Sequence, residues 1–329
     1  MEFSLCMIVK NEERVLARCL DSLHDLMDEI IIVDTGSTDA TKEIAARYTD
    51  KVYDFTWVDD FSAARNFAFS KATKDYIYSA DADEVLDDEN WAKFDILKRT
   101  LISDIEIVQM IYGNQLESGT AYNFDAELRP KLFKRLRTFT WIEPVHEQMR
   151  LDPVVYDSDI VITHKPEGLH SGRDYRIFLK EFEAGRRLSK HLHHMYAMEL
   201  FISGSDEDFL AAEPLFAQSA CDETRGIDEV KEAVCVVCHA ARLRDDAGTI
   251  LKMSLKDLLT EGSAEMCCEL GHYFYDHGDY EEAAMWFYNA MHETEAILTI
   301  QAAQEWPQKG YAMCAEKLGI PLEDIGENA

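Results

Sequence analysis

The chain has 329 residues, 47% of them hydrophobic, and a formal net charge of −30 at pH 7. This length and hydrophobic content are typical of a folded protein with two domains. The negative charge disfavours nucleic acids and anionic membranes as main partners, because binding to their phosphates depends on Lys and Arg. No apolar run approaches the roughly 20 residues that span a bilayer, and the N-terminus lacks a basic signal region. We therefore expect a cytoplasmic protein without a membrane span.

The first part of the chain alternates between strand-like and helix-like hydrophobic patterns. The predicted elements are a strand at 3–9, a helix at 12–26, strands at 29–33 and 52–55 around a helix at 40–48, a helix at 62–70 and a strand at 76–79. Such alternation predicts a mostly parallel sheet with helices between its strands. In such a sheet, ligands bind beyond the carboxyl ends of the strands.

Polar residues follow three of these predicted strands. The segment Lys10-Asn11-Glu12-Glu13 follows the first strand, Asp34 ends the second, and Asp81 and Asp83 follow the fourth. Carboxylates that are brought together repel one another, and a bound cation with a nucleotide would remove that repulsion. Asp81 and Asp83 are hard oxygen ligands that can hold a divalent cation against a phosphate. By itself, the pair is also compatible with a solvated acidic turn.

Further extended segments are predicted at 105–112, 128–135 and 154–162. The second of them carries a basic stretch, which comprises Arg129, Lys131, Lys134, Arg135 and Arg137. One interpretation is an exposed strand whose charges protect the edge of a sheet. The other is a surface near a substrate that carries phosphate.

The pattern becomes helical after Pro166-Glu167-Gly168, which predicts two domains, 1–168 and 169–329. Several positions have the spacing of a tetratricopeptide-type helix pair: Leu270, Gly271, Phe274, Gly278, Tyr280, Ala283, Phe287 and Ala290. A weaker echo, at Phe209, Ala212, Phe216 and Ser219, precedes it by about two repeat periods. We expect two to three helical hairpins whose aromatic residues form a core, with binding of a partner or acceptor as a hypothesis.

The eight cysteines are scattered, which is typical of reduced thiols. Cys235 to His239 has the C-x-x-C-H spacing of covalent haem attachment, but it lies in a segment with helical periodicity and no export signal is visible. We therefore interpret these cysteines as core residues.

Four segments together resemble a known family. They are Cys6-Met7-Ile8-Val9-Lys10-Asn11-Glu12-Glu13, Ile31-Ile32-Val33-Asp34-Thr35-Gly36-Ser37-Thr38-Asp39, Trp57-Val58-Asp59-Asp60-Phe61-Ser62-Ala63-Ala64-Arg65-Asn66 and Ala80-Asp81-Ala82-Asp83-Glu84. In this order and spacing they are similar to glycosyltransferase family 2, in the branch with a tetratricopeptide-like C-terminal region. The resemblance covers residues 3 to 170 well and the helical part only loosely. It implies an α/β domain of the GT-A fold, Rossmann-like with a mostly parallel sheet, followed by an all-α domain.

The resemblance also implies a nucleotide diphosphate sugar as donor, with UDP as the nucleotide. The backbone near Val9 and the side chains of Asn11 and Glu13 would line the nucleoside pocket, where Asp34 would accept the N3 proton of uracil. Arg65 would neutralise the diphosphate through bidentate hydrogen bonds. The alternative for Arg65 is an ordinary ion pair on a helix surface.

For the metal, the resemblance implies that Asp83 is a direct ligand of Mn²⁺ or Mg²⁺ and that Asp81 faces the ribose or a metal-bound water. His164 would be a third ligand, although a histidine at a strand end is also often simply hydrogen-bonded. Family members invert the anomeric centre, which calls for one general base. Glu147 is the candidate for this base and His146 the alternative, within a V-H-E motif that departs from the E-D pair of many members.

The sequence thus predicts a metal-dependent, inverting hexosyltransferase that acts on a peptide, protein or glycan acceptor. The alternative is a non-catalytic tetratricopeptide-like adaptor with a vestigial nucleotide-sugar domain. A nucleotidyltransferase would need a basic, glycine-rich loop after the first strand, where the acidic Lys10-Asn11-Glu12-Glu13 stands. The helical domain could also pair with a second copy of the chain.

Overall fold

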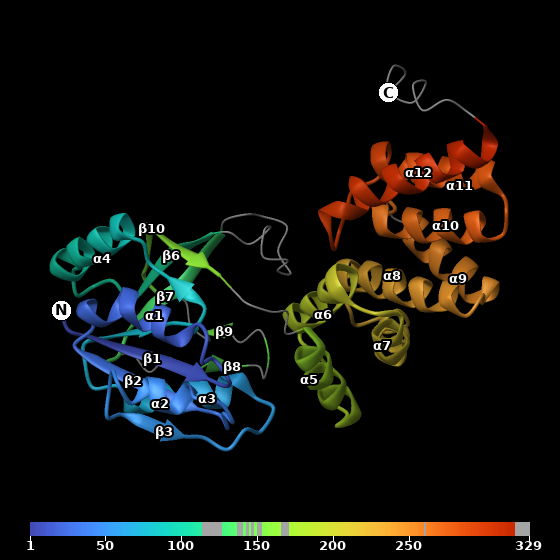
Figure 1. Ribbon diagram of the computed structural model, residues 1–329. Helices are drawn as coiled ribbons and strands as arrows, with labels where there is room; N and C mark the ends of the chain where they lie inside the picture. Colours follow the sequence, from blue (N-terminus) through green and yellow to red (C-terminus); the bar gives the residue numbers. More distant parts are fainter. Residues whose placement is uncertain are drawn as a thin grey trace. The chain divides into compact units, whose positions relative to one another are not determined.

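The computed structural model describes residues 1–113, 127–136, 141–142, 145, 148–149, 153–165, 171–259 and 261–319. The chain divides into two compact units, Met1–His170 and Ser171–Ala329 (Figure 1). Each unit has hydrophobic clusters of its own. The first unit is α/β and the second is all-α, so the predicted fold class is confirmed.

The first unit is built around an eight-stranded sheet with the order β3-β2-β1-β4-β7-β6-β10-β5. Its strands are β1 (Phe3–Val9), β2 (Glu29–Asp34), β3 (Val52–Asp54), β4 (Tyr76–Ser79), β5 (Glu84–Val85), β6 (Ile107–Gly113), β7 (Glu127–Lys134) and β10 (Val155–His164). The helices are α1 (Leu16–Leu23), η1 (His24–Leu26), α2 (Thr41–Ala45), α3 (Phe61–Lys71) and α4 (Asp88–Thr100). Two short strands, β8 (Trp141–Ile142) and β9 (Gln148–Met149), form a separate pair.

Alternating side chains of the first strands pack on opposite faces of the sheet, as the period of a strand requires. On β1, Phe3, Leu5 and Met7 join a core with residues of α1, α2 and α4, whereas Cys6 joins a second core with residues of α3. The sheet is therefore covered on both faces, which explains the nearly continuous apolar runs of β1 and β2. Figure 1 shows α1 and α4 on one side of these strands.

The sheet is mixed because β7 runs antiparallel between β4 and β6. Strands β1 to β4 pair in parallel, as predicted, and β6 pairs in parallel with β10. The basic stretch begins on β7, so its interpretation as an exposed edge strand is wrong. Lys131, near the middle of this strand, is only 5% exposed.

The second unit consists of helices in sequence. They are α5 (Ser171–Glu183), α6 (Lys190–Ser203), α7 (Asp206–Ser219), α8 (Ile227–Leu243), α9 (Ala247–Leu258), α10 (Ala264–Asp276), α11 (Tyr280–His292), η2 (Ile300–Ala303) and α12 (Glu305–Leu318). The predicted repeat lies on α10 and α11, and its echo lies on α7. Among the described residues, no helix is both long enough and apolar enough to cross a membrane.

Helix α11 packs through Phe287 against glycines of two neighbouring helices. A Cβ atom at Gly271 of α10 would lie 2.7 Å from the Phe287 ring, and one at Gly310 of α12 would lie 2.4 Å from it. The ring is fully buried. Position 271 therefore requires a glycine, because the aromatic ring occupies the space that a side chain would need. The repeat pattern predicts a small residue here.

Candidate active site

The loops after β1 and β2 are joined by hydrogen bonds at the carboxyl edge of the sheet. Asn11 has a positive φ of 57°, and its Oδ1 accepts a bond of 2.8 Å from the N–H of Thr38. Glu13 Oε2 accepts a bond of 3.1 Å from the N–H of Ala40, and Val9 accepts one of 3.0 Å from Thr35. The structure therefore brings Val9, Asn11 and Glu13 to one edge, where their oxygen atoms shape the two loops.

Asp34, at the end of β2, is 2% exposed. Its Oδ1 accepts bonds of 3.0 Å from the N–H groups of Gly36 and Ser37. Its Oδ2 is buried and has no hydrogen-bond partner among the described residues. Because an unpartnered buried acceptor is costly, this oxygen suits a donor group of a bound ligand.

Arg65 of α3 reaches the end of β4. Its guanidinium donates one hydrogen bond of 2.8 Å to Ser79 Oγ and one of 3.1 Å to Asp81 Oδ1. Partial burial opposes ionisation of Asp81, but the charges of Arg65 and Lys131 outweigh it and lower the pKa of this carboxyl below its ordinary value. The Arg65 side chain is 14% exposed and forms an ion pair with Asp81, so both interpretations of Arg65 stay open.

Asp83 and His164 come together from distant parts of the chain. Asp83 Oδ2 lies 2.9 Å from His164 Nε2, and the N–H of Lys165 donates a bond of 3.0 Å to the backbone oxygen of Asp83. The two side chains are 18% and 14% exposed. His164 was predicted either to bind a metal or to be simply hydrogen-bonded. Its hydrogen-bond partner is Asp83, the predicted metal ligand, so this position suits both alternatives.

The Asp83–His164 spacing fits a divalent cation. An ion that binds two ligands at about 2.1 Å in octahedral geometry separates neighbouring ligands by about 3 Å. The described residues contain no group of three or more His, Cys, Asp or Glu side chains placed to hold a metal. An ion at Asp83 and His164 would therefore take its further ligands from a bound molecule or from water, as Mg²⁺ commonly does.

A buried ion pair adjoins these residues. Lys131 Nζ of β7 lies 2.6 Å from Glu84 Oε1 of β5, and the two side chains are 7% and 1% exposed. Burial raises the pKa of Glu84 to about 7, against the opposing effect of Lys131. Glu84 was not among the residues predicted for the site, although it follows the D-x-D motif directly.

Two further groups near His164 come from β6 and β7. The Tyr112 ring lies 5.3 Å from the imidazole, and the Arg129 guanidinium lies 4.0 Å from the Tyr112 ring. Arg129 also contributes to the lowered pKa of Asp81. Two cations of the basic stretch, Arg129 and Lys131, therefore act on the candidate site. Glu147 and His146, the predicted bases, lie outside the described residues, as does Arg137.

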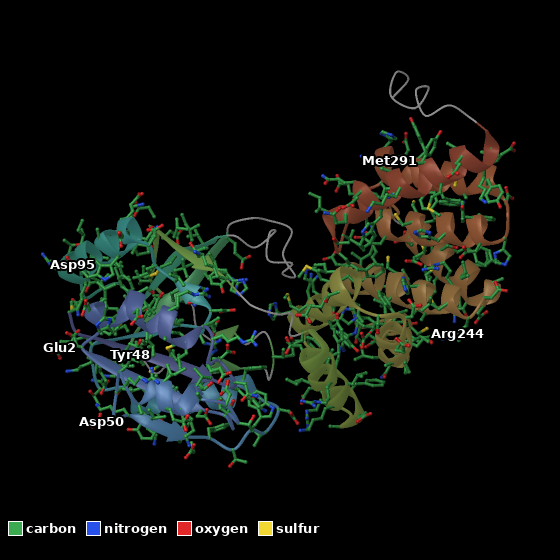
Figure 2. The ribbon with its side chains drawn as sticks, viewed as in Figure 1. Glu2, Tyr48, Asp50, Asp95, Arg244 and Met291 are labelled. Atoms are coloured by element: carbon green, nitrogen blue, oxygen red, sulfur yellow. The ribbon has the colours of Figure 1, made fainter. Side chains whose placement is uncertain are left out.

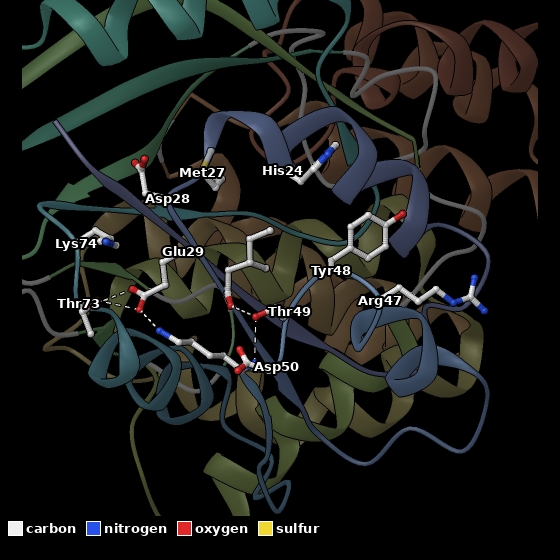
Figure 3. A pocket seen from close by; sticks show the side chains of 12 residues that line it. His24, Met27, Asp28, Glu29, Arg47, Tyr48, Thr49, Asp50, Thr73 and Lys74 are labelled. Carbon is white, nitrogen blue, oxygen red and sulfur yellow. Dashed lines mark hydrogen bonds and ion pairs between the residues drawn. The ribbon is translucent and has the colours of Figure 1, made fainter.

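A cavity of about 810 Å³ lies at the opposite, amino-terminal edge of the sheet (Figure 3). Glu2, Tyr48 and Asp50, labelled in Figure 2, mark this end of the unit. Within the cavity, Glu29 Oε1 lies 2.5 Å from Lys51 Nζ, and the N–H of Thr73 donates a bond of 2.8 Å to Glu29 Oε2. Glu29 is thus held by groups of the protein itself, and the cavity lies away from the carboxylates that the sequence singled out.

Comparisons with known proteins agree with the predicted family. Residues 4–95 match the family model described as "Glycosyl transferase family 2". Over 92 residues the chain is 50% identical to a TPR repeat-containing protein of Synechococcus elongatus, a match that covers 28% of this chain and 23% of that protein. Over 96 residues it is 38% identical to the SPbeta prophage-derived glycosyltransferase SunS of Bacillus subtilis, covering 29% of this chain and 23% of SunS.

Solved structures give a further likeness. Glucosyl-3-phosphoglycerate synthase from Mycobacterium tuberculosis, in complex with Mg²⁺ and UDP, is 15% identical with a TM-score of 0.42, covering 57% of this chain and 81% of that one. The chain spans about a quarter of the length of the two curated relatives named above. Within the first unit, residues 4–95 therefore match glycosyltransferase family 2, and an all-α unit follows the first unit.

Proposed function

We propose that this protein transfers a sugar from a UDP-sugar to an acceptor in a reaction that depends on Mn²⁺ or Mg²⁺. The observation that carries the proposal is the meeting of Asp83 and His164 at 2.9 Å, beside an Asp81 that is bound to Arg65. A bound cation at Asp83 and His164 would stabilise the charge that develops on the diphosphate leaving group. Arg65 supplies fixed positive charge to the same edge of the sheet.

Asp34 supports uridine as the nucleoside. Its buried Oδ2 needs a donor, and the N3–H of uracil is such a donor. The side-chain oxygens of Asn11 and Glu13 fix the loops around Asp34, so in this proposal they shape the pocket through the backbone. The proposed pocket is therefore built before the donor arrives.

The reaction that we propose inverts the anomeric carbon and needs one base. Glu147 is the proposed base, supported by the resemblance of its V-H-E motif to the family branch, and His146 is the alternative. The acceptor is a peptide, protein or glycan, held in part by the helical unit. The transferred sugar is a hexose, and the cytoplasmic location expected from the sequence remains a prediction.

Isothermal titration of UDP, GDP and their sugar conjugates into the full chain, with Mn²⁺ and with EDTA, tests the donor site. We expect binding of UDP compounds that strengthens with Mn²⁺ and loses this dependence in D83A. A folded protein that binds none of these compounds would refute the proposal and favour the adaptor. Donor hydrolysis and sugar transfer by E147Q then test the base: loss of transfer with UDP binding retained is expected.

A further inference from the structure

Glu84 lies at the junction that holds the two proposed metal ligands together. It pairs with His164 in the antiparallel register of β5 and β10. Its backbone N–H donates a bond of 3.2 Å to the carbonyl oxygen of Asp81. The backbone N–H of Lys165 donates a bond to the carbonyl oxygen of Asp83, the residue before Glu84. The turn that carries the D-x-D motif is thus attached to the end of β10 through Glu84 and its neighbour.

The side chain of Glu84 attaches the same turn to the middle of the sheet. Lys131 belongs to β7, which pairs with β4, the strand that leads into the D-x-D motif. Its Nζ lies 2.6 Å from Glu84 Oε1, and both side chains are almost completely buried. In the sheet, β6 and β10 lie between β7 and β5, so the ion pair connects two strands that are not neighbours.

Stability alone does not account for this pair. Replacement of a buried ion pair by apolar side chains of similar size is often neutral or stabilising, because both charges lose their hydration on burial. Glu84 Oε2 is buried without a hydrogen-bond partner among the described residues, so the carboxylate is also incompletely satisfied. A charged pair at this place calls for a role beyond holding the fold together.

The surrounding charges indicate that role. Asp81, Asp83 and Glu84 lie within four consecutive residues, and each carboxylate is a potential ligand for a hard cation. Lys131 occupies Oε1 of Glu84, and its charge also acts on Asp81. With Glu84 bound to an ammonium group, Asp83 remains the carboxylate that faces His164.

We propose that the Glu84–Lys131 pair is a positioning device of the donor site: it holds Asp83 against His164 and keeps the Glu84 carboxylate from competing for the bound cation. The inference rests on the proposed function, since it concerns the metal of the same site. Lys131 and Glu84 are positioning residues here, because they act through Asp83 and His164.

The test is titration of UDP into the full chain with Mn²⁺ and with EDTA, for the wild type, K131M and K51M. We expect K131M to weaken UDP binding at least tenfold in Mn²⁺ and less than twofold in EDTA, because the contacts of Asp34 are unchanged. K51M is the matched control: it breaks a lysine–glutamate pair of 2.5 Å at the opposite edge of the sheet. It should lower the thermal midpoint and leave UDP binding within twofold in both conditions.

Two results would overturn the inference while leaving the proposed function intact: UDP binding by K131M as strong as that of the wild type in Mn²⁺, or an equal loss in Mn²⁺ and EDTA. A wild type that binds no nucleotide would refute the proposed function and, with it, the inference. If K131M does not fold, E84M/K131M replaces it, because removal of both charges leaves no unpaired charge in the interior. The double variant has no Glu84 carboxylate to compete for the cation, so a selective loss in Mn²⁺ is expected from the lost positioning of Asp83 alone.

Discussion

Asp34 has one oxygen that accepts hydrogen bonds and one that lacks a partner among the described residues, and this asymmetry makes its role testable. In D34N the amide oxygen can still accept the N–H groups of Gly36 and Ser37, and the amide NH₂ then replaces the buried Oδ2. That donor would face the N3–H of uracil, whereas N3 of cytosine is an acceptor. We expect the affinity for UDP to fall at least tenfold and the preference to shift towards CDP, because a buried donor without an acceptor is costly.

Competition titrations of UDP and CDP measure this change in selectivity. D54N is a suitable control, since Asp54 ends the neighbouring strand β3 and forms an exposed pair with Lys42. An unaltered UDP preference in D34N would show that Asp34 does not contact the base.

The common location of some residues of the candidate site could be predicted from local sequence, and that of others could not. Asp34, Asp81 and Asp83 end or follow strands that the hydrophobic pattern locates, so their common edge follows from the topology. Lys131 lies near the candidate site only because β7 is placed between β4 and β6. A basic residue on a strand carries no local signal that distinguishes a central strand from an edge.

At the scale of elements, Phe287 connects three helices through two glycines. In G271A the added methyl group would clash with the ring of Phe287, so the ring or a helix must shift. Such overpacking typically costs about 1–3 kcal/mol of unfolding free energy, more than the gain in helix propensity. Chemical denaturation followed by circular dichroism would measure the loss.

The matched control for this variant is G248A on α9. A Cβ at Gly248 would meet its nearest atom, Asp246 Oδ1, at an ordinary contact distance of 3.5 Å. This variant should be neutral or stabilised by up to about 1 kcal/mol. Equal effects of G271A and G248A would contradict the packing argument.

Glu29 connects β2 to neighbouring elements and makes the first unit sensitive to acid. Burial favours its neutral form, but bonds from Lys51, Ser4 and Thr73 outweigh this effect and lower its pKa from 4.5 to about 2. Because the folded-state pKa is lowered, the contribution of Glu29 to the free energy of unfolding is complete above pH about 4.5. It is lost as the pH falls towards about 2. The shift corresponds to about 3 kcal/mol of unfolding free energy at neutral pH.

Denaturation of wild type and E29Q between pH 7 and pH 3 tests this contribution. E29Q should be less stable at pH 7, and the difference should shrink as the pH falls. E2Q serves as the control, because Glu2 forms an exposed pair with Lys74 and should contribute little. A difference that stayed constant with pH would show that the charge of Glu29 is not responsible.

On the scale of the whole molecule, two compact units with separate cores predict two independently folding parts. A fragment from Ser171 to Ala329 should show a strongly helical circular dichroism spectrum and a cooperative thermal transition. A fragment ending at His170 should retain Mn²⁺-dependent binding of UDP. Little helix in the fragment from Ser171 to Ala329 would contradict the independent folding of the helical unit.

The alternation of strands and helices in the first unit and the helical periodicity of the second could be predicted because both are local patterns. The mixed character of the sheet could not, since β7 and β10 join it through pairings between residues far apart in the chain. The mixed sheet changes the charge at this edge, because β7 brings Arg129 and Lys131 close to the carboxylates of Asp81 and Glu84.

The pairing of β5 with β10 also has a consequence for biosynthesis. Asp83 and His164 are 81 residues apart in sequence, so a growing chain exposes the D-x-D motif long before its histidine partner exists. Loop closure over such a distance is slow compared with formation of local contacts. Strands β1 to β4 and their helices can therefore assemble first, and Asp83 meets His164 only after β10 has emerged and docked.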